Sequence, residues 1–397
     1  MPKIPHVLLL IESSRAYGRD CLMGIASYMR AHGTWDVLQL ERGLQEDVPA
    51  SVSRQRFDGV IARAENSQIA KSIARFGVPT VDLRGLFAPA DGVTFNTDNE
   101  ACGAMAVEHY RQRGFRHLAF CGYEGVDFSD GRRDAFTHHA SLHGITAEVM
   151  TVRSKPRPSK PNATFDTLGR EARGEDDDAK IAKWMVSLPK PVGIFACNDM
   201  RGRQVIAAGR RAGLRIPDQV AVLGVDNDEV ICDLANPPLS SIVPDTHRLG
   251  FEGAAMLDQL MNGQVPEQSQ ILFPPRSITV RLSTDALAVN DLDLAEAIEF
   301  IRNNACDGIG VKDVTKATAI SRTTLERRFR EALERSPREE IERVRGDRIR
   351  VLLAETDYNL DQIASLTGYG SGAHLVTAFR RLEGCTPGKY RAKYRDN

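Results

Sequence analysis

Between residues 6 and 281 the sequence alternates short apolar runs with longer segments of helical periodicity. His6–Ile11, Asp58–Ala62 and Val192–Cys197 are runs of the first kind, and Arg19–Arg30 and Met200–Ala212 are segments of the second. Strands buried on both faces are almost continuously apolar, and helices that connect parallel strands cover both faces of the sheet. The alternation therefore predicts an α/β fold with parallel sheets and helices on both faces. Further strands are predicted at 35–40, 79–82, 92–95, 117–121, 147–152, 220–225 and 240–243, and further helices at 68–75, 100–113, 132–142, 179–188 and 247–261, with residues 271–281 ending the domain.

Two polar segments interrupt this pattern. Arg153–Asp178 is rich in proline and charged residues and poor in apolar ones, so we expect a mobile surface loop there. Ser283–Asn290 precedes a new helical pattern and is predicted to be a linker. A chain of 397 residues is long enough for two or three domains with cores of their own.

The last part of the chain, Asn359–Tyr394, is predicted to form two short helices separated by a glycine-containing turn. Apolar residues at helical spacing precede Gly368-Tyr369-Gly370, and Ser371 then stands where a helix N-cap is expected. Helix, short turn and helix is the arrangement of a helix-turn-helix, whose second helix lies in the DNA major groove. An ordinary helical hairpin with a solvated basic tail is the alternative.

The same arrangement occurs upstream in Val311–Ser336, where Ser321 precedes the second helix, and Arg338–Glu355 is predicted to be one connecting helix. Two such units on a linker helix resemble the DNA-binding domain of the AraC-type transcription regulators. The sequence departs from the usual pattern of that family at Leu375 and Thr377. The residues that carry the resemblance are Ile320, Ser321, Leu325, Phe329, Ile363, Ala364, Gly368, Tyr369, Phe379 to Arg381, Gly384 to Pro387, Tyr390 and Arg391.

This resemblance implies that the second helix of each unit contacts DNA. Arg322 can form two hydrogen bonds with a guanine, whereas the outward residues of the second unit are small and weakly polar. We therefore expect the first unit to read bases and the second to rely more on DNA shape and phosphate contacts. The predicted DNA-contacting residues are Arg322, Thr323, Thr324, Arg327, Ser371, Gly372, His374, Thr377, Arg380 and Arg381.

Charge alone is weak evidence for a nucleic-acid partner. The formal net charge of the chain is -1, and from Leu292 onward there are 19 Lys and Arg against 17 Asp and Glu. The seven cysteines lack a C-x-x-C spacing, so we expect free thiols in a reducing compartment, with no metal site and no cofactor. No signal-peptide pattern or long apolar span is present, which predicts a cytoplasmic protein with no membrane partner.

A second resemblance lies in the α/β part. Ile194–Asp199, Ala212–Asp218, Val222–Asn227 and Pro237–Ser241 follow in the order that resembles the sugar-binding core of LacI-type repressors and periplasmic sugar-binding proteins. The resemblance implies two α/β lobes with a ligand in the cleft between them. The predicted domains are a two-lobed effector domain at 1–284, a linker at 285–291 and an AraC-type domain at 292–397.

The order of these domains resembles the family of xylose-operon regulators, and Ser13–Arg19 and Ala297–Cys306 look similar to that family too. The resemblance implies a sugar-responsive activator of pentose (D-xylose) catabolic genes. It further implies that a homodimer binds double-stranded promoter DNA and works with RNA polymerase. A regulator that responds to another sugar, or that represses, is the alternative.

Sugar hydroxyls require paired acceptors, charged donors and an aromatic surface. Asp226 and Asn198 directly follow buried strands, where open α/β sheets bind ligands, and both match hydroxyl-binding positions of the family. Arg132 matches an arginine that forks onto sugar hydroxyls, with a solvated arginine as the alternative. Asp199 is either a ligand or the N-cap of the following helix, and Tyr17 either stacks on the sugar or lies in the core. Ser14, Arg19, Glu65 and Asn66 complete the predicted cleft residues, and Pro244 stands where related binders often carry a polar ligand.

An enzyme is disfavoured. The sequence contains none of the motifs G-x-G-x-x-G, G-x-x-x-x-G-K-[ST], G-x-S-x-G or H-E-x-x-H. Asp199 and Asp226 could be interpreted as paired carboxylates, and His139 and His143 share a helical face, but no acidic ligand motif accompanies the histidines. The helical C-terminal hundred residues also disfavour a sugar-binding module without DNA binding.

Overall fold

The computed structural model describes residues 4–33, 35–41, 43, 48–87, 89, 92–152, 177–285 and 292–395. The chain divides into two compact units. The α/β unit comprises residues 1–110 and 116–286, and the helical unit comprises residues 111–115 and 287–397. Most of the expected loop at 153–178 and the expected linker at 285–291 lie outside the described residues.

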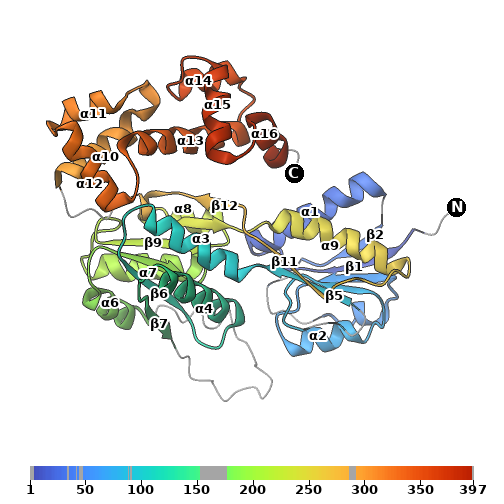
Figure 1. Ribbon diagram of the computed structural model, residues 1–397. Coiled ribbons are helices and arrows are strands. Elements are labelled where there is room, and N and C mark those ends of the chain that lie inside the picture. The colour runs from blue at the N-terminus through green and yellow to red at the C-terminus, as the bar shows by residue number, and fades with distance from the viewer. Residues whose placement is uncertain are drawn as a thin grey trace. The chain divides into compact units, whose positions relative to one another are not determined.

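The α/β unit contains two six-stranded sheets (Figure 1). The first sheet has the order β11-β5-β4-β3-β1-β2, and every neighbouring pair in it is parallel. We call this sheet with its helices the first lobe. Its elements are β1 (His6–Leu10), α1 (Ala16–His32), β2 (Asp36–Gln39), β3 (Gly59–Ala62), α2 (Ser67–Ala74), β4 (Thr80–Asp82), β5 (Gly92–Thr97), α9 (Thr246–Met261) and β11 (Gln270–Phe273).

The second sheet has the order β12-β10-β9-β8-β6-β7, and only the edge strand β12 runs antiparallel to its neighbour. This sheet with its helices is the second lobe. Its elements are α3 (Asn99–Arg111), β6 (His117–Tyr123), α4 (Asp127–Leu142), β7 (Glu148–Val152), α6 (Asp178–Ser187), β8 (Val192–Ala196), α7 (Asp199–Arg211), β9 (Val220–Val225), α8 (Glu229–Leu234), β10 (Ser240–Val243) and β12 (Ser277–Thr279).

The chain passes between the lobes after β5, after β10 and after β11. Residues 271–281, expected only to end the domain, thus supply an edge strand to each sheet. The parallel sheets with helices on both faces agree with the predicted fold class.

Alternate residues of β1 show why helices cover both faces of the first sheet. Val7 and Leu9 pack with residues of α1 and α9, whereas Leu8 and Leu10 pack with residues of α2. All of these side chains are nearly inaccessible to solvent, as expected for a strand whose side chains point alternately to two buried faces. Helices α1 and α9 can approach closely because Gly24 has no side chain. A Cβ atom at this position would lie 2.0 Å from the main-chain oxygen of His247.

Two elements of the second lobe differ from the sequence prediction. Helix α4 begins at Asp127, five residues before the predicted start at Arg132. Its first turn is polar, so apolar periodicity does not reveal it, but Asp127 and Asp130 are favourable at the positive end of a helix. Helix α8 was not predicted, because its six residues are too few to show a helical period.

The helical unit contains two helix-turn-helix units joined by one long helix. The first consists of α11 (Val311–Thr318) and α12 (Arg322–Leu333), and the second of α14 (Leu360–Leu366) and α15 (Gly372–Glu383). The connecting helix is α13 (Pro337–Glu355), and α10 (Leu292–Asn304) and α16 (Pro387–Arg395) complete the unit.

Local sequence explains both turns. The Ser321 and Ser371 hydroxyls accept hydrogen bonds from the main-chain N–H groups of Thr324 and His374, which makes these serines the predicted N-caps. The turn before α15 contains Gly368 with a φ of 72°, a conformation that favours glycine. Leu325 and Phe329 are buried in one core, and Leu375 and Phe379 in the other.

Candidate functional site

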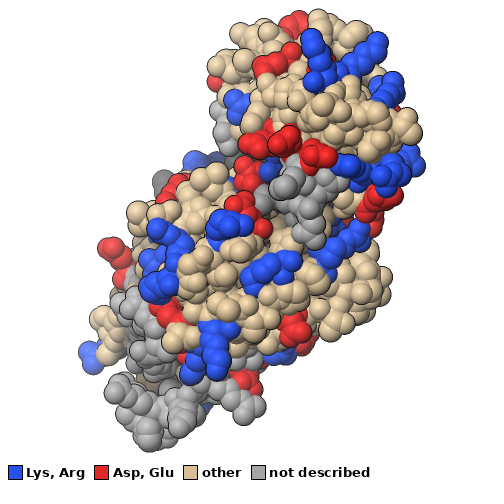
Figure 2. All heavy atoms as spheres, turned by 90° about the vertical axis from the view of Figure 1, so that its left-hand side faces the viewer, with Lys and Arg blue, Asp and Glu red and all other residues tan. Residues whose placement is uncertain are grey.

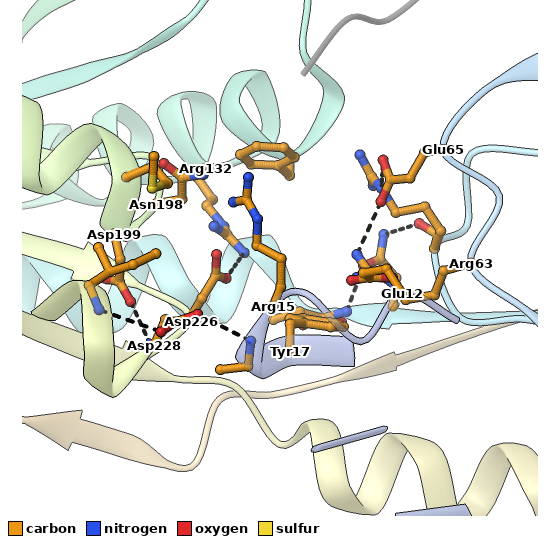
Figure 3. A pocket seen from close by; sticks show the side chains of 17 residues that line it. Glu12, Arg15, Tyr17, Arg63, Glu65, Arg132, Asn198, Asp199, Asp226 and Asp228 are labelled. Atoms are coloured by element: carbon orange, nitrogen blue, oxygen red, sulfur yellow. Dashed lines mark hydrogen bonds and ion pairs between the residues drawn. The ribbon is translucent and has the colours of Figure 1, made fainter. Parts of the chain in front are cut away.

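A pocket in the α/β unit lies at the carboxyl ends of strands from both sheets (Figure 3). This is where open parallel sheets characteristically bind ligands. The first lobe contributes Glu12, Arg15, Ala16, Tyr17, Arg63, Glu65, Arg84, Asn96 and Thr97 to its walls. The second lobe contributes Phe128, Arg132, Asn198, Asp199, Met200, Asp226, Asp228 and Ile231.

On the second lobe, Arg132 is directed at Asp226. Its guanidinium donates to the main-chain oxygen of Cys197 at 2.5 Å and to the side-chain oxygen of Asn99 at 3.1 Å, and it lies 3.7 Å from the Asp226 carboxylate. Only 4% of Arg132 is exposed, so these acceptors hold the guanidinium in place. Asn198 accepts a hydrogen bond from the Arg201 N–H and is the N-cap of α7. The pocket thus has a fixed donor beside a carboxylate and an amide.

Asp199 lines the pocket but uses both carboxylate oxygens elsewhere. Oδ1 accepts from the Ser241 hydroxyl at 2.6 Å and Oδ2 from the main-chain N–H of Asp228 at 2.8 Å. Burial, followed by the nearby charge of Asp226, raises the pKa of Asp199 well above its usual value. The alternative that Asp199 caps α7 is not what the structure has, because Asn198 occupies the N-cap position and Asp199 is the first residue of the helix.

On the first lobe, acids and arginines alternate along the wall. Arg63 pairs with Glu12 and lies 3.3 Å from Glu65, and Glu65 accepts a hydrogen bond from Arg84 at 3.1 Å. All four side chains are at least nine-tenths buried. Burial raises the pKa of Glu12, and the Arg63 charge opposes that shift. The wall therefore presents paired rather than isolated charges.

Two aromatic rings border the pocket, and each has arginines over it. The Tyr17 hydroxyl is hydrogen-bonded to Thr97 at 3.0 Å, and the Arg63 guanidinium lies 4.3 Å from the Tyr17 ring centroid. The guanidinium carbons of Arg84 and Arg132 lie 5.5 and 5.2 Å from the Phe128 ring centroid. Either ring can offer an apolar surface to a ligand.

Contacts also join the two lobes across the pocket. Arg84 of the first lobe donates two hydrogen bonds to Asp127 of the second, at 2.6 and 2.7 Å. The main-chain N–H of Ala16 donates to Asp228 at 3.1 Å. A forked arginine–carboxylate pair fixes both distance and orientation, so it holds the lobes together at the cleft.

The structure brings together six of the nine predicted cleft residues, namely Tyr17, Glu65, Arg132, Asn198, Asp199 and Asp226. Ser14, Arg19 and Asn66 are not in the pocket wall. Ser14 is exposed, Arg19 donates to the main-chain oxygen of Ser13, and Asn66 caps α2 by accepting from the Ile69 N–H.

Sequence reasoning missed several charged residues of the wall. Glu12, Arg63 and Arg84 closely follow β1, β3 and β4, and Asp228 follows β9. Their position after strands is the same signal that identified Asp226, and it could have identified them.

In the helical unit, the predicted DNA-contacting side chains of α12 are exposed except Thr324, which is half-buried and hydrogen-bonded to Ser321. Arg322 uses Nε to pair with Glu326 at 2.9 Å, and its side chain is 68% exposed. Arg327 pairs with Glu331 at 2.8 Å. Each of these arginines is thus oriented by an acid one turn along the helix.

The second unit exposes four of its six predicted residues. His374, Thr377 and Arg380 are exposed on α15, and Arg381 is exposed too and paired with Glu342 of α13. Gly372 is buried, because its N–H donates to Asp361 of α14 at 2.8 Å and a Cβ atom would lie 2.8 Å from that carboxylate. Gly372 therefore packs between the helices and is not on the outer face.

The face of the molecule in Figure 2 shows basic side chains of the helical unit interspersed with acidic ones. This agrees with the small excess of basic residues in the sequence of that part. No helix within the described ranges is long and apolar enough to cross a membrane.

Three family models match successive parts of the chain. A XylR N-terminal domain matches residues 6–95, a periplasmic binding protein-like domain matches 107–284, and a helix-turn-helix domain matches 314–393. The xylose operon regulatory protein of Escherichia coli (strain K12) is 28% identical over 394 residues, covering 97% of this chain and 96% of that protein. The protein of the same name from Haemophilus influenzae is 27% identical and covers 97% of each.

Solved structures extend the similarity to the fold. A structure described as the xylose-binding transcription activator XylR matches 99% of both chains with a TM-score of 0.60 and 26% identity. The transcriptional regulator CelR in complex with cellobiose matches 71% of this chain and 86% of that one, with a TM-score of 0.53 and 19% identity. These relatives are transcription regulators and not enzymes.

Proposed function

The chain belongs to the xylose operon regulator family, and from this premise we propose that it is a transcription activator that binds a pentose, with D-xylose as the first candidate. The single observation that carries the proposal is the combination of one polar pocket between two lobes with two helix-turn-helix units in the same chain. In this proposal the sugar occupies the pocket and DNA is bound by α12 and α15. The effector domain is assigned to 1–284, the linker to 285–291 and the DNA-binding domain to 292–397.

The chemistry of the pocket suits a polyhydroxylated ligand. Asp226 and Asn198 offer acceptors for sugar hydroxyls, and the buried Arg132 offers donors that are already oriented. Phe128 and Tyr17 offer apolar surface for the C–H faces of the ring. The arginines of the first-lobe wall are already paired with acids of the same wall. The ligand therefore does not have to carry a charge to balance them.

The experiment is a gel-shift assay with promoter DNA in the presence and absence of sugars, together with a thermal-shift screen of pentoses and hexoses. A ligand at a hundredfold excess over its Kd should add about 2.7 kcal/mol to the free energy of unfolding. A sugar that both stabilises the protein and changes the DNA shift supports the proposal. A DNA shift that no sugar alters, or no specific shift at all, contradicts it. Weaker DNA binding with sugar would identify a repressor.

We further propose that the protein acts in the cytoplasm as a homodimer on two half-sites and contacts RNA polymerase. Each chain carries two DNA-binding helices that can occupy major-groove segments about 34 Å apart. Exposed apolar side chains on the α/β unit, including Val230 and Leu234 of α8, offer a surface for a second copy. A monomeric mass by light scattering, with and without sugar and DNA, would count against the dimer.

Alanine in place of Arg322 is expected to change DNA sequence preference, whereas alanine in place of Arg380 is not. Arg322 donates to Glu326 through Nε, and its Nη groups are the donors that can form two hydrogen bonds with a guanine. Its loss should cost about 1–3 kcal/mol on the specific site and relax one base position. Arg380 is expected to contact a phosphate, so its loss should weaken binding to all DNA sequences alike. The slope of log K against log salt concentration should fall by about one.

Selection of binding sites from random DNA by each variant measures both effects. The assignment of base reading to the first unit would be reversed by two results together. The Arg322 variant would select the same DNA motif as wild type, and most of the sequence preference would lie in the half of the motif that the second unit binds. Glu299→Ala, an exposed acid of α10 outside both helix-turn-helix units, is the control.

Asparagine in place of Asp127 is expected to weaken sugar binding without removing a sugar contact. The Arg84–Asp127 pair holds the lobes together, so its loss favours the open cleft. The apparent affinity for the sugar then falls in proportion to the fraction of molecules whose cleft is closed. Asp127 is 31% exposed, so solvent reduces the effect to about 1 kcal/mol or less. Calorimetric titration should show an affinity a few-fold weaker, whereas Asp134→Asn on the same helix should leave it unchanged.

A further inference from the structure

The loop that follows β9 has an unusual backbone conformation. Asp226 has a φ of 108° and Asn227 a φ of 47°, and neither residue is glycine. Residues with side chains avoid this region, so two in succession persist only where surrounding contacts enforce them. Asp226 is the carboxylate that faces Arg132, and Asp228 reaches Ala16 of the other lobe. The conformation of this loop therefore sets two contacts of the pocket.

Asp199 and Ser241 supply the contacts that hold the loop. Asp199 accepts from the Asp228 N–H at 2.8 Å and from the Ser241 hydroxyl at 2.6 Å, and Ser241 in turn accepts from the Asn227 N–H at 3.0 Å. Figure 3 shows Asp199 beside Asp228, with a dashed line joining them. The main-chain N–H groups of Asn227 and Asp228 thus donate to the Ser241 hydroxyl and to the Asp199 carboxylate, which are hydrogen-bonded to each other.

The strand beneath is shaped to admit this carboxylate. A Cβ atom on Gly224 would lie 2.3 Å from Asp199 Oδ1, so glycine leaves the space that the carboxylate occupies. Asp199 is 1% exposed and Ser241 is fully buried. Both oxygens of Asp199 accept hydrogen bonds from protein donors, and the side chain is almost inaccessible, so its acceptors are directed mainly at the loop and at Ser241.

We propose that Asp199 is a positioning residue and not a sugar ligand: together with Ser241 it holds the loop 226–228, in which Asp226 and Asn227 have positive φ, so that Asp226 faces the sugar and Asp228 reaches the opposite lobe. This inference rests on the proposed sugar-binding function. It assigns to Asp199 and Ser241 an effect on sugar affinity that passes through Asp226.

The first arm of the test needs no sugar. Hydrogen exchange of the full chain, followed by mass spectrometry, reports the amides of Asn227 and Asp228 in wild type, Asp199→Ala and Ser241→Ala. Exchange should become faster in peptides covering 220–234 and stay unchanged elsewhere. Asp218→Ala, an exposed acid of the same lobe, is the control. Unchanged exchange in this segment would overturn the proposal, and Ser241→Ala decides it if Asp199→Ala fails to fold.

The second arm is a double-mutant cycle on sugar affinity. Asp199→Ala should weaken binding of the sugar found in the screen by about tenfold, yet cost little more once Asp226 is already alanine. Asp199→Asn, whose amide can bond both Asp228 and Ser241, should retain affinity within a few-fold of wild type. Losses that multiply in the double variant would show that the effect of Asp199 does not pass through Asp226 and would overturn the inference. If the wild type binds no sugar, the proposed function fails, and the exchange arm alone decides whether Asp199 holds the loop.

Discussion

Glutamine in place of Glu340 should lower the free energy of unfolding of the helical unit by about 3 kcal/mol at neutral pH. Glu340 on α13 is fully buried and accepts hydrogen bonds from Arg335 at 2.6 Å and from Arg343 at 2.7 Å. Burial by itself raises the pKa of this carboxyl, but the two arginines outweigh burial and lower the pKa to about 2. Removing the charge leaves two partly buried guanidinium groups without their shared acceptor, which is the costly way to break an ion pair.

The pH dependence follows from the direction of this shift. Because the folded pKa lies below the ordinary value of 4.5, the stabilisation is present above pH 4.5 and is lost as the pH falls toward 2. The Glu340→Gln variant should be less stable than wild type at pH 7, and its stability should change less over that acidic range. Equal stability of the two proteins at pH 7 would show that the ion pairs contribute nothing net.

The chain contains its own control for this measurement. Both tryptophans, Trp35 and Trp184, are in the α/β unit, so their fluorescence reports unfolding of that unit alone. Far-UV circular dichroism during urea unfolding also follows the helical unit. Glu340→Gln should shift the part of the circular dichroism transition that reports the helical unit to lower urea concentration. It should leave the tryptophan fluorescence transition unchanged. Glu331→Gln, which removes an exposed acid paired with Arg327, should change stability by less than about 0.5 kcal/mol.

The sequence predicted the strands and the DNA-binding helices well because each has a strong local signal. Val220–Val225 is predicted and observed with the same bounds, since a buried parallel strand is apolar without interruption. Ser321 and Ser371 mark the starts of α12 and α15 because capping depends on residues only three positions apart. Helix α8 has a capping residue, Asp228, but its six residues are too few to show a helical period.

The pairing of charges within the wall of the pocket could not be predicted in the same way. Arg84 is an ordinary polar residue in the sequence, and only the fold brings Glu65 and Asp127 to it from 19 and 43 residues away. Gly372 presents the opposite case, since helical spacing places it on the outer face of α15 and the approach of Asp361 buries it. Both errors arise because spacing along one element does not reveal which distant element packs against it.

Alanine or asparagine in place of Asp226 should weaken sugar binding by about 1.5–3 kcal/mol, which is roughly a ten- to hundredfold rise in Kd. In the proposed function this carboxylate accepts sugar hydroxyls beside Arg132, whose guanidinium lies 3.7 Å away. Asparagine is the sharper substitution, because it tolerates the left-handed backbone at φ 108° better than alanine and removes only the charge.

Two consequences separate loss of a ligand from loss of structure in the Asp226 variants. DNA binding without sugar should equal that of wild type, because the helical unit is a separate compact unit. Thermal stability without sugar should stay close to that of wild type, because loss of the ion pair with Arg132 is opposed by relief of the repulsion between Asp226 and the buried Asp199. Calorimetric titration with the sugar from the screen measures the affinity, and gel shifts measure the DNA binding. Wild-type sugar affinity in Asp226→Asn would show that this carboxylate does not contact the sugar and that Arg132 and Asn198 bind it without Asp226.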